Sequence, residues 1–69
     1  MEAKEIFDLI IKADEKLKYA TPDKADARAA QARELLVQAR TEAEAVGNQA
    51  LVEQARRRLA DLEALQTGG

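Results

Sequence analysis

The chain is short, and its composition excludes most chemistry. Its 69 residues include 11 basic and 13 acidic side chains, so the net charge is −2 and no single-sign field attracts nucleic acid or anionic lipid. It has no cysteine, histidine or serine, so we expect one domain that is not an enzyme and has no cofactor or metal, with neither nucleic acid nor membrane as a partner.

The first predicted helix covers residues 3–20. Asp8 and Lys12, and Asp14 and Lys18, stand four residues apart in the order that favours ion pairs on a helix surface. We expect both pairs to form on a solvated face. The opposite face carries an apolar stripe at helical spacing, made of Ile6, Leu9, Ile10, Ala13, Leu17 and Ala20.

A short joint follows the first helix. Pro22 disfavours helical geometry at the residue before it and suits the first position of a new helix, while Thr21 is a favourable capping residue. The second helix is therefore predicted over residues 22–46. Because the joint is so short, the two helices are expected to be antiparallel neighbours.

The second helix contains one apolar seam with steps of three and four residues, the spacing of a helix packed on other helices. Gly47 suits the left-handed conformation that ends a helix, and Asn48 suits the cap of the next one. The larger seam residues lie toward Gly47, so we expect the isoleucines of the first helix to fill that end. The seam consists of Ala25, Ala29, Ala32, Leu36, Ala39, Ala43 and Val46.

The third helix is predicted over residues 49–66, and a disordered tail over residues 68–69. The three helices match in length and share one spacing, which indicates an all-α fold: an antiparallel three-helix bundle running up, down and up within one domain, residues 1–67. The apolar stripe of the third helix contains Leu51, Val52, Ala55, Leu59, Leu62 and Leu65.

Few polar residues suggest a functional site. Glu42 and Glu44 are close in sequence, but two positions on a helix project them about 200° apart, so they do not form a catalytic pair. The basic run at residues 56–58 is more distinctive. Glu53 is spaced to pair with Arg56 and Arg57, and these two arginines have two interpretations, a solvated face or a docking contact for an acidic partner.

Several apolar residues lie outside the predicted stripes. Phe7 and Ile11 fall to one side of the first helix's stripe, Val37 falls beyond the edge of the second helix's seam, and Tyr19 points nearly opposite the core. Leu35 lies at the other edge of the seam. In a bundle each helix faces two neighbours, so we expect Leu35 to be a core residue. Phe7 and Ile11 are either core residues or, where uncovered, a patch suited to an amphipathic helix from a partner or a second copy.

Residues 32–65 resemble part of a tetratricopeptide repeat. Ala32, Leu36 and Ala39 stand at the Ala-x-x-x-aromatic-x-x-Ala spacing of the second helix in that repeat, with leucine in place of the aromatic residue. Leu59-Ala60 is similar to the Leu-Gly or Leu-Ala pair of the helix that follows. Three long helices also resemble a microtubule-interacting-and-trafficking domain, which grips short helical peptides between its helices. Both resemblances imply peptide binding by a helical scaffold.

Two functions remain open. The first is a noncatalytic protein-interaction module that binds a helical segment of a partner, with Phe7, Ile11 and Val37 as apolar anchors and Arg56 and Arg57 as a charged rim. The second is homo-oligomerisation or structural packing within a larger protein, through the same apolar residues. No segment is long and apolar enough for a membrane span or a signal peptide, so a cytoplasmic location is expected.

Overall fold

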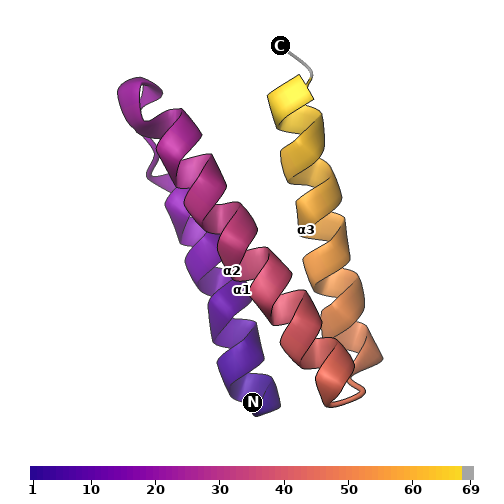
Figure 1. Ribbon diagram of the computed structural model, residues 1–69. Coiled ribbons are helices and arrows are strands. Elements are labelled where there is room, and N and C mark those ends of the chain that lie inside the picture. The colour runs from indigo at the N-terminus through magenta and orange to yellow at the C-terminus, as the bar shows by residue number, and fades with distance from the viewer. Residues whose placement is uncertain (68–69) are drawn as a thin grey trace.

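The computed structural model describes residues 1–67, with side chains as far as residue 64. Three helices, α1 (Ala3–Lys18), α2 (Ala25–Ala45) and α3 (Gln49–Thr67), run up, down and up again (Figure 1). A single 3-10 turn, η1 (Pro22–Lys24), precedes α2. The chain is an all-α three-helix bundle, as its apolar periodicity predicts.

The three apolar stripes meet in one core. Ile6, Ile10 and Leu36 are the largest of the fully buried side chains, while Leu9 and Leu17 are half-buried against the core. The spacing of three and four residues therefore identified the inward face of each helix. The buried core of the described residues consists of Ile6, Ile10, Ala13, Ala29, Ala32, Leu36, Ala39, Ala43, Leu51, Val52, Ala55, Leu59 and Leu62.

The predicted seam of α2 is wrong at its two ends. Val46 is 50% exposed because it is the C-cap of α2, where the backbone leaves the helical path. Ala25 is also exposed, since it lies beside the joint where α1 has already ended. The side chain of Leu65 and the predicted tail, residues 68–69, lie outside the described residues.

The joint between α2 and α3 has the structure that its sequence predicts. Gly47 adopts φ +72°, the left-handed conformation that costs glycine little. The backbone N–H of Asn48 donates to the carbonyl of Ala43 at 2.9 Å and that of Gly47 to the carbonyl of Glu44 at 3.2 Å, which is a Schellman motif. The Asn48 side chain then accepts a hydrogen bond from the N–H of Leu51 at 3.2 Å, which caps α3.

The joint between α1 and α2 differs from the prediction. The first helix ends at Lys18 rather than at residue 20, and α2 starts at Ala25 rather than at Pro22. Thr21 makes no capping hydrogen bond, and its hydroxyl instead donates to the Asp23 carboxylate at 2.6 Å. Because Pro22 opens a 3-10 turn, the first amides of α2 lie beyond the reach of Thr21.

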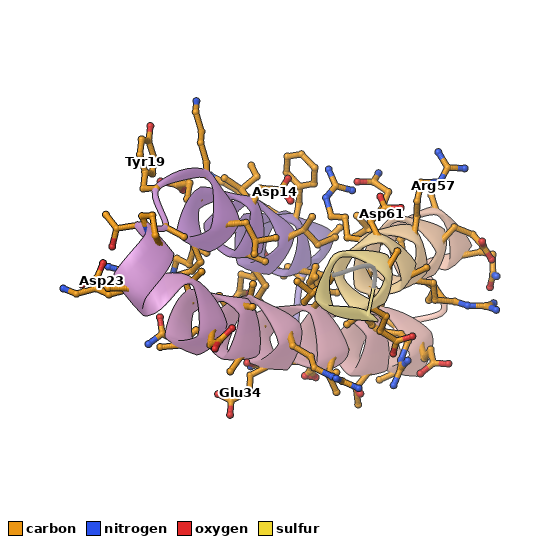
Figure 2. All side chains as sticks on the ribbon, turned by 90° about the horizontal axis from the view of Figure 1, so that it is seen from above. Asp14, Tyr19, Asp23, Glu34, Arg57 and Asp61 are labelled. Atoms are coloured by element: carbon orange, nitrogen blue, oxygen red, sulfur yellow. The ribbon has the colours of Figure 1, made fainter. Side chains whose placement is uncertain are left out.

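The helix α2 is the common wall of the bundle. Both α1 and α3 pack along its length, whereas they contact each other only sparingly. Viewed from above, α1 and α3 lie on the same side of α2 (Figure 2). This arrangement leaves both flanks of α1 accessible, and Phe7 and Ile11 lie on one of them.

Candidate functional site

Phe7 and Ile11 form an exposed apolar pair on α1. The sequence left open whether they are buried, and the structure leaves Phe7 43% and Ile11 39% exposed. Four residues separate them, so their side chains are neighbours on one face of the helix. We call these two residues the apolar pair.

The apolar pair lies on the flank of α1 that borders α3. Asp14 is three residues after Ile11, on the same flank, and both of its carboxylate oxygens accept a hydrogen bond from Nε of Arg58 in α3, at 3.0 and 3.1 Å. Figure 2 shows Asp14 between the two helices. The predicted ion pair of Asp14 with Lys18 is therefore wrong, because α3 provides a better-placed cation.

Val37 lies on a different surface. It follows Arg33 by one helical turn, and Arg33 pairs with Glu63 of α3 at 3.6 Å. Glu63 is five positions beyond Arg58, which places the two about 140° apart around α3. Val37, 37% exposed, thus borders the opposite side of α3 from the apolar pair, and the predicted anchors do not form one surface.

The two arginines of the predicted rim also separate. Arg56 pairs with Glu53 at 3.7 Å, as its spacing predicts, and both side chains are largely exposed. Arg57 has no ion-pair partner among the described residues. Arg57 lies about 100° around α3 from Arg58, the residue that contacts α1, and Figure 2 shows it on the outer side of α3.

A second surface, which the sequence analysis did not identify, is an open groove between α1 and α2. We call it the cationic groove. Its volume is about 470 Å³, and its lining residues are Lys12, Glu15, Lys16, Tyr19, Arg28 and Leu35. The spacing of Lys12, Lys16 and Tyr19 by four and three residues was visible in the sequence, but nothing there indicated that Arg28 and Leu35 would face them.

The cationic groove lies on the side of the bundle away from α3. Lys16 stands nine residues after Phe7, which places it about 180° around α1 from the flank that borders α3. Lys12, Lys16 and Arg28 make no ion pair with any described residue, so the predicted Asp8–Lys12 pair does not form. The two flanks of α1 thus differ in chemistry: one is apolar and the other is cationic.

Neither surface has the features of a reaction centre. Within the described part of the chain no polar side chain is buried, and no group of three acidic side chains is placed to hold a metal ion. Glu42 and Glu44 lie on divergent faces of α2, one half-buried and one exposed.

The chain matches no known protein-family model, no curated protein and no solved structure. Among residues 1–67, no helix combines the length and the apolar character that crossing a lipid bilayer requires.

Proposed function

We propose that this chain is a noncatalytic protein-interaction module that binds an amphipathic helix of a partner protein on the flank of α1 that borders α3. The apolar pair carries the proposal. Phe7 and Ile11 are large, adjacent and about two-fifths exposed, although the same helix buries Ile6 and Ile10 completely. Adjacent exposed apolar side chains rimmed by charge are typical of protein-binding surfaces.

A helix is the occupant that best fits the spacing. Phe7 and Ile11 lie one turn apart along α1, and the side chains that a docking helix presents recur every three or four residues. Covering the exposed parts of both side chains contributes on the order of 2 kcal/mol, which alone supports only weak binding. The rest of the affinity must come from further contacts along the flank.

We assign Arg57 as a charged contact for the part of the incoming helix that extends over α3, because it is next to Arg58, which ties α3 to α1. It lacks a partner among the described residues, so a carboxylate on the incoming helix would gain an ion pair without breaking one. Such a rim contact contributes more to orientation and association rate than to affinity. Val37 and Arg56 border the other side of α3 and have no role in this proposal.

A library of displayed helical peptides tests the proposal. We expect selection on the native chain to yield peptides with apolar residues three or four positions apart. The substitution Phe7→Asp should weaken their binding by roughly tenfold or more, measured by fluorescence anisotropy. Val37→Asp is the matched control. Val37 lies in α2, is similarly exposed and borders the other flank of α3, so this substitution should leave the affinity unchanged.

Two results would contradict the proposal. Equal loss of binding in Phe7→Asp and Val37→Asp would show that the peptides recognise a general property of the chain. Self-association that Phe7→Asp abolishes, measured by light scattering over a dilution series, would assign the apolar pair to a homodimer instead. Circular dichroism of each variant shows that the helices remain folded in the comparison.

A further inference from the structure

The cationic groove has a ligand chemistry of its own, independent of the proposed helix-binding function. We propose that it binds a short acidic segment of a partner protein in which carboxylates flank an apolar side chain. The groove lies between α1 and α2 on the side away from α3, so its occupant does not compete with a helix on the apolar pair. Its volume of about 470 Å³ accommodates a few side chains.

Charge indicates an anionic ligand. Three cations, Lys12, Lys16 and Arg28, line the groove with one carboxylate, Glu15, in a chain whose net charge is −2. None of the three cations is paired within the described residues, so they repel one another. Lys16 and Arg28 are half-buried, which restricts their side chains. An incoming carboxylate would form new ion pairs there without displacing an existing partner.

The remaining residues of the groove indicate an apolar group between the carboxylates. Leu35 is half-buried against the core and contributes an apolar side chain to the groove. Tyr19 contributes an exposed aromatic ring, over which the Lys18 ammonium lies 5.5 Å from the centroid. A peptide that carries an apolar side chain among acidic ones matches this mixed lining.

The same residues argue against a nucleic acid or a free phosphate. Glu15 places a negative charge among the cations, which disfavours a continuous phosphate backbone along the groove. Tyr19 is the groove's sole aromatic residue, so stacking of successive bases has no platform. A peptide is therefore the ligand class that the lining favours.

Titration of the intact isotope-labelled chain with a defined peptide tests the proposal by NMR. The probe is an acetylated and amidated Glu-Glu-Leu-Glu-Glu peptide, and the control is its glutamine counterpart, Gln-Gln-Leu-Gln-Gln. We expect saturable shifts in residues 12–19 and 28–35 for the acidic peptide only. Binding should weaken as salt is added, because exposed charges are screened.

Two double variants decide which cations act. Lys16→Gln with Arg28→Gln should weaken binding by roughly tenfold, because two ion pairs are lost. Lys4→Gln with Arg40→Gln is the matched control: it removes one lysine and one half-buried arginine outside the groove, neither with an ion pair among the described residues, and should leave the affinity unchanged. Both double variants keep every core residue, so their melting temperatures should match that of the native chain.

Several outcomes would overturn the assignment. Equal weakening in both double variants would show that only net charge matters. Equal binding of the glutamine peptide would exclude carboxylate recognition, and inorganic phosphate that reproduces the same shifts at the same concentration would indicate a simple anion site. If the acidic peptide causes no saturable chemical-shift changes in the labelled chain, the proposed binding to the cationic groove is also refuted. Phe7→Asp should leave this titration unaffected, so failure here is distinct from failure of the helix-binding proposal.

Discussion

The two ends of the bundle are held in different ways. At the α2–α3 end, the first half of α1 contributes the large, fully buried Ile6 and Ile10, and the joint is fixed by backbone hydrogen bonds and an asparagine cap. At the α1–α2 end, α2 contributes the small Ala29 and Ala32, and a 3-10 turn makes the joint. The large side chains therefore come from α1 at one end, whereas at the other end α2 contributes alanines and α3 contributes the buried Leu59 and Leu62.

The largest expected effect is a cavity at the α2–α3 end. Ile10→Ala removes a fully buried side chain and should lower the free energy of unfolding by about 2–5 kcal/mol. A single core of this size supplies only about 3–5 kcal/mol, so the variant should be largely unfolded at 37 °C in thermal melts. Ile11→Ala, the exposed neighbour, should lose about 1 kcal/mol or less in urea denaturation. Equal losses would contradict the packing described.

Overfilling tests the alanine-lined end. Ala32 is fully buried in the core, so Ala32→Leu should displace the side chains and helices around it and cost about 1–3 kcal/mol. Ala30→Leu adds the same atoms to an exposed position of α2 and should change stability by about 0.5 kcal/mol or less. Thermal denaturation of the two variants gives the comparison. A stabilised Ala32→Leu variant would show that this end contains unfilled space.

The smallest expected effect compares the two joints. A side chain at Gly47 would meet no atom within 4 Å, so Gly47→Ala should cost only the left-handed backbone penalty, about 1–2 kcal/mol. Thr21→Ala at the other joint removes no capping bond and should cost about 0.5 kcal/mol or less. Urea denaturation would measure both losses of unfolding free energy, provided that the dependence of this free energy on urea concentration is the same in both variants. A larger loss for Thr21→Ala than for Gly47→Ala would mean that the bond of Thr21 to Asp23 contributes more to stability than the conformational freedom of Gly47.

The fold was predictable because its determinants are local. Apolar residues at helical spacing identified the inward face of each helix, and Gly47-Asn48 identified one joint together with its cap. The Thr21-Pro22 joint was less predictable. Proline is equally compatible with an α-helix and with a 3-10 turn at its first position, so the sequence did not fix where α2 begins.

The candidate site was less predictable because it depends on contacts between distant segments. Spacing within α1 favoured Asp14–Lys18, but Arg58, 44 positions away in the chain, holds Asp14 instead. The apolar residues Phe7 and Val37 were each correctly marked as lying outside the stripes, yet their separation by α3 depends on helix arrangement. The cationic groove likewise exists only because Arg28 and Leu35 face α1.

The role of α2 as common wall also has a kinetic consequence. Each pair of extensively packed helices is joined by a short connection, so most tertiary contacts form between segments that are close along the chain. Chains with such low contact order fold in about microseconds to milliseconds. The two helical hairpins that share α2 need only a short conformational search. The contact between α1 and α3, which includes the ion pair of Asp14 with Arg58, joins segments that are far apart in the chain.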